Sequence, residues 1–115
     1  MKILVIGGGI LGASVLRQLK LNPKFEIVVA DWRKDCVAVK TGVIKKVDIL
    51  AHVTPMNAVD IVEHVNPDLV LIARTQKDWK HEDTTLGHHF ISNMERELSH
   101  ISIPVIIVDI AMREF

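Results

Sequence analysis

The chain has 115 residues, of which 49% are hydrophobic, and its 14 basic and 14 acidic side chains give a formal net charge of zero. A chain of this length is expected to form one domain that buries a sizeable core without help from disulfides. Its basic residues are scattered, with Lys45 and Lys46 the nearest approach to a cluster, so the charge pattern argues against binding to nucleic acid or to an anionic membrane.

Cysteine content and the first apolar run indicate where the protein works. Cys36 is the only cysteine, which excludes an internal disulfide and favours a reducing compartment. The apolar run at the amino terminus is broken by glycine after a few residues, too early for a signal peptide or a membrane-spanning helix. We therefore expect a cytoplasmic protein.

The first twenty residues contain a complete strand, turn and helix. Residues 2–6 form a short apolar run rich in β-branched residues, which is typical of a strand buried on both faces. Glycines follow with the spacing Gly-x-Gly-x-x-Gly, at Gly7, Gly9 and Gly12. Residues 10–19 then carry apolar side chains at the spacing of one helical face.

Each glycine of this motif has a physical role in a phosphate-binding turn. Gly7 permits the tight turn off the strand, Gly9 lets the main chain approach a pyrophosphate, and Gly12 lets the helix pack closely on the sheet. The unpaired amides and the positive dipole end of the helix then face the phosphates. The predicted dinucleotide-binding turn consists of Gly7, Gly8, Gly9, Ile10, Leu11 and Gly12. The alternative is a structural turn in a nucleotide-free α/β domain.

A second predicted strand, residues 26–30, ends at Asp31, close to the offset of about 20 residues expected after the glycines. A carboxylate here accepts hydrogen bonds from the adenosine ribose hydroxyls and repels a 2′-phosphate, which favours NAD over NADP. NADP stays possible, because Arg33 is placed to pair with a 2′-phosphate, and Trp32 or Arg33 to stack on adenine. The alternative for Arg33 is a solvated basic turn.

The middle of the chain continues the alternation of strand and helix. A loop and short helix are expected to stop at Gly42, and a third strand lies near residues 47–51. Thr54 is a good N-cap with Pro55 at the first helical position, so a helix is predicted from there to Asn66.

Residues 69–73 form the expected fourth strand, and its last residue, Ala73, leads into Arg74 and Thr75. In a doubly wound sheet the carboxyl end of this strand lies beside the first strand, across the crevice that holds the ligand. Ala73, Arg74 and Thr75 are therefore cofactor-facing by topology. Arg74 either meets a phosphate or a substrate acid, or is a surface arginine.

The last part of the chain supplies one more helix and strand. A helix capped by Thr84 or Thr85 is predicted to bury a stripe that ends in Met94, Leu98 and Ile101. Pro104 then opens a fifth strand, residues 105–109. Together these elements predict a three-layer α/β fold, doubly wound, with a five-stranded parallel sheet in the order 3-2-1-4-5.

On these residues the sequence resembles the NAD(P)-binding Rossmann superfamily over its whole length. It looks most like the nucleotide-binding half of saccharopine dehydrogenase-like proteins and the regulatory nucleotide-binding domains of potassium transport systems. The resemblance rests on KILVIGGGILG at the start, IVVAD at 27–31 and AHVTPMNAVDIVEHVNPDLVLIA at 51–73. It implies that His52 and Val53 contact adenine, with His52 standing where the saccharopine-like pattern has an acid.

The sequence gives little support for a metal site or for catalytic residues. His81, Glu82, His88 and His89 suggest a metal site, but adjacent histidines on a helix point about 100° apart and cannot easily share one ion. We expect no metal site and no catalytic residue, because an acid or base beside the nicotinamide usually comes from a second domain.

The sequence therefore predicts an NAD(H)-binding module that works as a sensor or regulatory subunit. The alternative is the cofactor domain of an NAD(P)-dependent oxidoreductase whose substrate-binding half lies on another chain or is missing from this sequence. A third hypothesis is a nucleotide-free scaffold whose crevice is filled by Trp32 or Trp79. Residues 110–115 are a candidate contact for a homodimer, and a separate catalytic or transport subunit is a further possible partner.

Overall fold

The computed structural model describes residues 1–74 and 93–108, and its centre is a five-stranded parallel sheet in the order β3-β2-β1-β4-β5. This confirms the predicted fold class. The strands are β1 (Lys2–Ile6), β2 (Glu26–Asp31), β3 (Ile49–Leu50), β4 (Leu69–Ile72) and β5 (Val105–Ile107). The helices are α1 (Ile10–Leu19), α2 (Val37–Lys40) and α3 (Ala58–Val65), and residues 93–98 are also helical.

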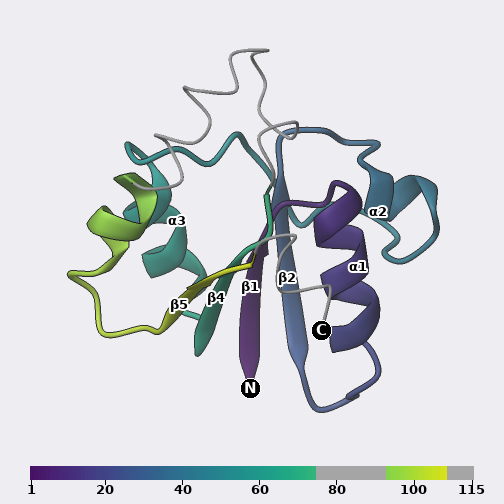
Figure 1. Ribbon diagram of the computed structural model, residues 1–115, viewed down its shortest axis with the longest axis horizontal. Coiled ribbons are helices and arrows are strands. Elements are labelled where there is room, and N and C mark those ends of the chain that lie inside the picture. Colours follow the sequence, from purple (N-terminus) through teal and green to yellow (C-terminus); the bar gives the residue numbers. More distant parts are fainter. Residues whose placement is uncertain (75–92, 109–115) are drawn as a thin grey trace.

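Helices cover both faces of the sheet (Figure 1). The helices α1 and α2 lie on one face, while α3 and the helical residues 93–98 lie on the other. The strand β1 sits in the middle, paired with β2 on one side and β4 on the other, and its residues 3–6 are buried. Burial on both faces explains why this strand is a continuous apolar run rather than an alternating one.

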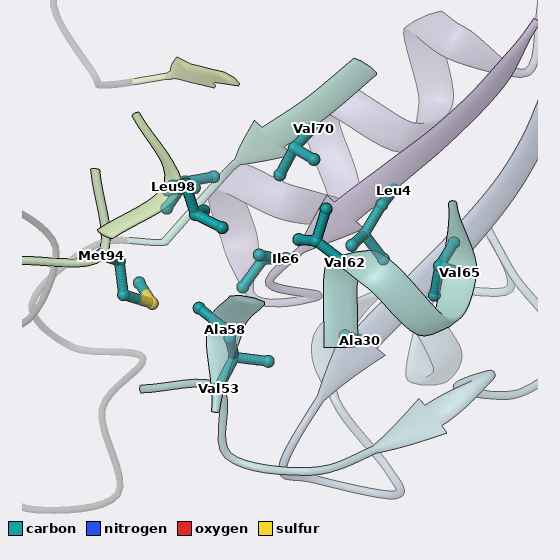
Figure 2. Close-up of a cluster of buried hydrophobic side chains, with 11 residues drawn as sticks. Leu4, Ile6, Ala30, Val53, Ala58, Val62, Val65, Val70, Met94 and Leu98 are labelled. Atoms are coloured by element: carbon teal, nitrogen blue, oxygen red, sulfur yellow. The ribbon is translucent and has the colours of Figure 1, made fainter. Parts of the chain in front are cut away.

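The sheet separates two apolar clusters. Alternate residues of a strand point to opposite faces, so Leu4 and Ile6 pack under α3 whereas Ile3 and Val5 pack under α1. The first cluster also contains Met94 and Leu98, two members of the predicted helical stripe, which reach in from residues 93–98 (Figure 2). The predicted amino-terminal part of that helix lies outside the described residues.

The third helix starts later than predicted. Thr54 is not its N-cap, because residues 55–57 form a turn and α3 begins at Ala58. Asn57 accounts for the difference: its side chain accepts the Thr54 amide at 2.7 Å and donates to the His52 carbonyl at 3.1 Å. These two bonds hold the chain in a turn before the helix starts. The predicted stop is confirmed, since Asn66 is left-handed with φ 52°.

Two strands are shorter than predicted. The strand β3 is only Ile49–Leu50, and it pairs with Ala30 and Asp31 at the carboxyl end of β2. The strand β5 ends at Ile107, and Asp109 lies outside the described residues. No helix within residues 1–74 and 93–108 combines the length and the apolar character that crossing a bilayer requires.

Candidate functional site

The turn between β1 and α1 is shaped by close contacts that no side chain would fit. Gly7 has φ +117°, and a Cβ on it would lie 2.5 Å from the Ala73 carbonyl oxygen at the end of β4. A Cβ on Gly12 would lie 1.9 Å from the Gly7 carbonyl oxygen. The turn, the first helical turn of α1 and the end of β4 are therefore packed main chain against main chain, which only glycine permits.

Gly8 is fixed from two directions. Its amide donates to Asp31 Oδ2 at 2.7 Å, and its carbonyl accepts the Ala38 amide of α2 at 2.9 Å. A Cβ at this position would lie 2.7 Å from Cys36 Sγ. The contacts with Cys36 and Ala38 were not predicted, because no sequence pattern marks a short helix that packs on a turn far earlier in the chain.

The amino terminus of α1 presents open donors beside this turn. Gly9 is the N-cap, and the Ala13 amide is the first to bond back, to the Gly9 carbonyl at 2.8 Å. The amides of Ile10, Leu11 and Gly12 donate to no acceptor in the described parts of the chain. The Ile10 residue is 70% exposed. Three amides without an acceptor, together with the positive end of the helix dipole, are suited to an anion.

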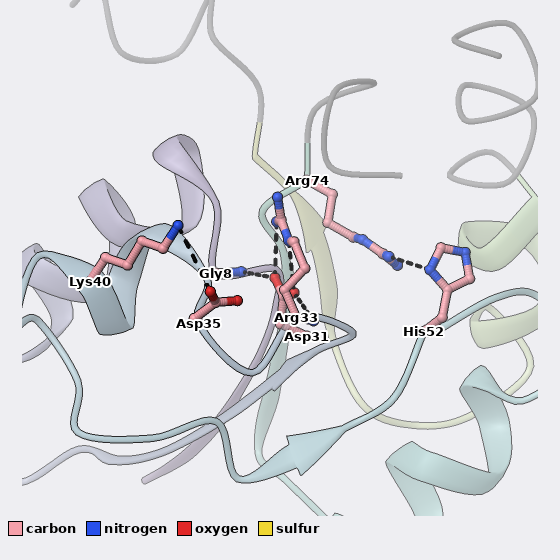
Figure 3. Close-up of polar contacts among 7 residues, drawn as sticks. All are labelled: Gly8, Asp31, Arg33, Asp35, Lys40, His52 and Arg74. Carbon is pink, nitrogen blue, oxygen red and sulfur yellow. Dashed lines mark hydrogen bonds and ion pairs between the residues drawn. The ribbon is translucent and has the colours of Figure 1, made fainter. Parts of the chain in front are cut away.

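Asp31 lies at the carboxyl end of β2, only 4% exposed, and its carboxylate is saturated with donors (Figure 3). Besides Gly8, it accepts the Arg33 amide at 2.7 Å, Arg33 Nε at 3.1 Å and Arg33 Nη2 at 3.2 Å. Burial alone would raise the pKa of Asp31. The hydrogen bonds from Arg33 and Gly8 and the guanidinium charge outweigh burial, so the pKa lies below its ordinary value of 3.8.

Arg33 joins this carboxylate to an aromatic group. Its guanidinium carbon lies 5.3 Å from the centre of the Trp32 ring, a distance at which a cation is attracted to the ring face. Trp32 in turn meets the His52 ring edge-on, with centroids 6.5 Å apart and an interplanar angle of 71°. The side chains that follow β2 thus meet those that follow β3.

Arg74 is buried, with 5% exposure, so the surface-arginine alternative is wrong. Its Nη1 donates to the Val53 carbonyl at 2.6 Å, and its Nη2 lies 3.3 Å from His52 Nδ1 (Figure 3). Because a guanidinium has no acceptor, His52 Nδ1 must be the acceptor in this contact. The end of β4 is thereby tied to the segment that follows β3, at the same edge of the sheet as the glycine turn.

The fold brings together most residues of the predicted site. The glycine turn, Asp31, Trp32, Arg33, His52, Val53, Ala73 and Arg74 all lie at or just beyond the carboxyl ends of the strands. Thr75, Trp79 and the histidines at 81, 88 and 89 lie outside the described residues. Within those residues, no three or more histidine, cysteine or acidic side chains are grouped to hold a metal ion.

The topology and the turn define a Rossmann-like α/β fold. No protein-family model matches the sequence, and no curated protein matches it. Among solved structures, the chain is similar to apo histidine-tagged saccharopine dehydrogenase (L-Glu forming) from Saccharomyces cerevisiae, with a TM-score of 0.61 and 15% identity. The match covers 98% of this chain and 23% of the dehydrogenase. At this level of identity the likeness is one of fold.

Proposed function

We propose that this chain binds a nicotinamide dinucleotide, NAD(H), and serves as a sensor or regulatory module. The observation that carries the proposal is the juxtaposition of the open amides of Ile10, Leu11 and Gly12 with the buried Asp31 carboxylate at the end of β2. A dinucleotide needs these two features next to each other, since its pyrophosphate and its adenosine ribose are joined. The crossing point between β1 and β4 is where doubly wound sheets bind their ligands.

In this proposal the adenosine ribose takes over bonds that Arg33 now makes. Its hydroxyls replace the guanidinium nitrogens on Asp31, while the Gly8 amide keeps its bond to Oδ2. The adenine lies near Trp32, His52 and Val53, and the rest of the dinucleotide passes Gly7 toward Ala73 and Arg74. Arg33 neutralises the charge of Asp31, so NADP is disfavoured less than it would be beside a lone carboxylate.

A second candidate is the cofactor domain of an NAD(P)-dependent oxidoreductase whose substrate-binding half is on another chain. The fold likeness to about a quarter of a dehydrogenase favours it, since such enzymes carry their cofactor domain as one part of a longer chain. Capture of partners on the immobilised chain separates the two candidates. A dehydrogenase subunit without a glycine motif of its own supports the enzyme, whereas a transport or other regulated protein supports the sensor.

Isothermal titration with NAD, NADH, NADP and NADPH tests dinucleotide binding. The substitution Asp31→Ala should weaken NAD about tenfold or more, because it removes a charged hydrogen-bond acceptor from the ribose site. Asp35→Ala is the matched control, since Asp35 is an exposed carboxylate four residues further on, and it makes a 3.9 Å ion pair with the exposed Lys40. Absence of binding by all four nucleotides at millimolar concentration, with the fold intact, would contradict the proposal.

We further propose that the protein is cytoplasmic and forms a homodimer in which residues 110–115 take part. Sedimentation of the full chain and of a chain ending at residue 109 tests the second point. A dimer that the deletion converts to a monomer supports it. A sedimentation coefficient that changes only by the lost mass would rule out a role for that segment.

A further inference from the structure

A groove lies at the amino end of β2, at the opposite end of that strand from Asp31. It has a volume of about 460 Å³ and runs between the turn that precedes β2 and residues 44–48. Phe25, Ile27 and Ile44 line its apolar floor, and Lys20, Lys45 and Lys46 stand around it. A volume of this size falls within the range of small-molecule sites, roughly 300–1,000 Å³.

The groove exists because the amino half of β2, which pairs with β1 on one side, has no neighbouring strand on the other side. The two residues of β3 pair only with Ala30 and Asp31. Before them, Asp48 takes the place of a strand: its carboxylate accepts the Val29 amide at 2.9 Å, and its own amide donates to the Val29 carbonyl at 3.0 Å. The chain that leads up to Asp48 thus crosses beside β2 without pairing with the residues that precede Val29.

This arrangement leaves the main chain of Ile27 open. Successive residues of a strand direct their N–H and C=O groups to opposite sides, and Val29 and Asp31 both use theirs toward β3. The groups of Ile27 therefore point the same way, toward the groove. In the described parts of the chain, no residue donates to or accepts from them. A donor and an acceptor beside an apolar floor are the usual means of orienting a bound ligand.

The charges around the groove favour an anion. Three lysines line it against a single carboxylate, Asp48, and that carboxylate is already bonded to the Val29 amide. Lys20 is held in place by a hydrogen bond from its ammonium group to the Val43 carbonyl. Lys45 and Lys46 are exposed and free to turn toward a ligand. In a chain with no net charge, the adjacent Lys45 and Lys46 therefore stand beside this groove.

From these observations we infer that the groove is a second ligand site, which binds a small organic carboxylate with a flat or branched apolar body. The apolar body packs on Phe25, Ile27 and Ile44. The carboxylate accepts the Ile27 amide and pairs with the lysines. The site is independent of dinucleotide binding, because it uses neither the glycine turn nor the side chain of Asp31.

Amide chemical shifts of the full chain test the inference, with 2-naphthoate as the probe and neutral 2-naphthamide as its uncharged match. We expect naphthoate to shift Ile27, Lys45 and Lys46, and naphthamide to leave them nearly unchanged. The variant Lys45→Gln/Lys46→Gln should bind naphthoate about fivefold more weakly, as expected from the loss of two exposed charges. The control Arg17→Gln/Arg96→Gln removes the same charge from exposed positions outside the groove and should bind as the parent does.

Three results would overturn the inference. The first is equal shifts with the neutral amide, which would mean that the lysines play no part. The second is naphthoate affinity that the lysine variant leaves unchanged. The third is the absence of any shift at Ile27 up to millimolar naphthoate. If the shifts were confined to residues 8–12 and Asp31, the anion would be bound at the glycine turn instead of the groove.

Discussion

At the carboxyl end of β2, Asp31 is buried and accepts hydrogen bonds from Gly8 and Arg33, whereas at the amino end of the same strand Ile27 has an open main chain beside exposed lysines. The first region is fixed by main-chain packing before any ligand arrives. The second offers polar groups that are still solvated. Preorganised groups lose little entropy on binding, so the carboxyl end is suited to selective recognition and the amino end to salt-sensitive attraction.

The largest effect should come from the packing that fixes the carboxyl end. Gly12→Ala places a Cβ 1.9 Å from the Gly7 carbonyl oxygen, so α1 must move away from the sheet. We expect a loss of about 3 kcal/mol or more in the free energy of unfolding by urea.

Gly42→Ala is the control for this prediction, because Gly42 has φ +77° but open space around its Cα. It should cost about 1 kcal/mol, the price of a left-handed conformation alone. Equal losses in the two variants would show that the turn is not tightly packed.

A smaller loss is expected when the buried arginine is removed. Arg74→Met leaves the Val53 carbonyl without its 2.6 Å donor and His52 Nδ1 without Arg74. The free energy of unfolding should fall by about 2 kcal/mol, as for other buried polar groups that lose a partner. Arg96→Met, at an exposed position, should change it by less than about 0.5 kcal/mol. An unchanged free energy of unfolding in Arg74→Met would mean that the contacts of Arg74 with Val53 and His52 do not stabilise this end of the sheet.

Acid should weaken the carboxyl end through Asp31. Its pKa is lower in the folded protein than the ordinary 3.8, so the charged form stabilises the fold above pH 3.8. That contribution is lost as the pH falls from 3.8 through the folded pKa. In urea unfolding across this window, the wild type should lose more stability than Asp31→Asn. Parallel pH profiles would show that the carboxylate is not held in its charged form.

The smallest predicted effect concerns the choice between dinucleotides. Arg33→Gln removes the charge that neutralises Asp31, so NADP should bind less well relative to NAD, by about fivefold. Titration of both nucleotides measures the ratio. Lys34→Gln, the adjacent exposed lysine, is the control. An unchanged ratio of the two affinities in the Arg33 variant would show that the Asp31–Arg33 ion pair does not affect recognition of the ribose.

The fold could be predicted because local patterns and topology agree. The glycine spacing, the apolar runs of β1 and β4 and the acid that ends β2 each specify their own element, and right-handed crossovers then restrict the strand order. The later start of α3 could not be predicted, because Thr54 and Asn57 are both good caps and only the contact of Asn57 with the His52 carbonyl decides between them.

The arrangement of side chains in the candidate site could be predicted from the sequence only in part. The position of Asp31 at the end of β2, beside the glycine turn, could be predicted from its spacing to the glycines. The contact of Arg33 with Asp31 depends on which rotamer the Arg33 side chain adopts. The burial of Arg74 depends on its packing against Val53, which is 21 residues away in the sequence. Side chains after a strand end have many rotamers, and no periodic pattern records which one the neighbouring segments select.

Titration of the isotope-labelled chain with NAD, followed by its amide resonances, tests the central claim most directly. The account predicts saturable shifts at residues 8–12 and 31–33, strongest at Ile10, Leu11 and Gly12, while Ile27 and Lys45 stay unchanged. An unperturbed spectrum at millimolar NAD and NADP, or shifts that leave the glycine turn untouched, would contradict it.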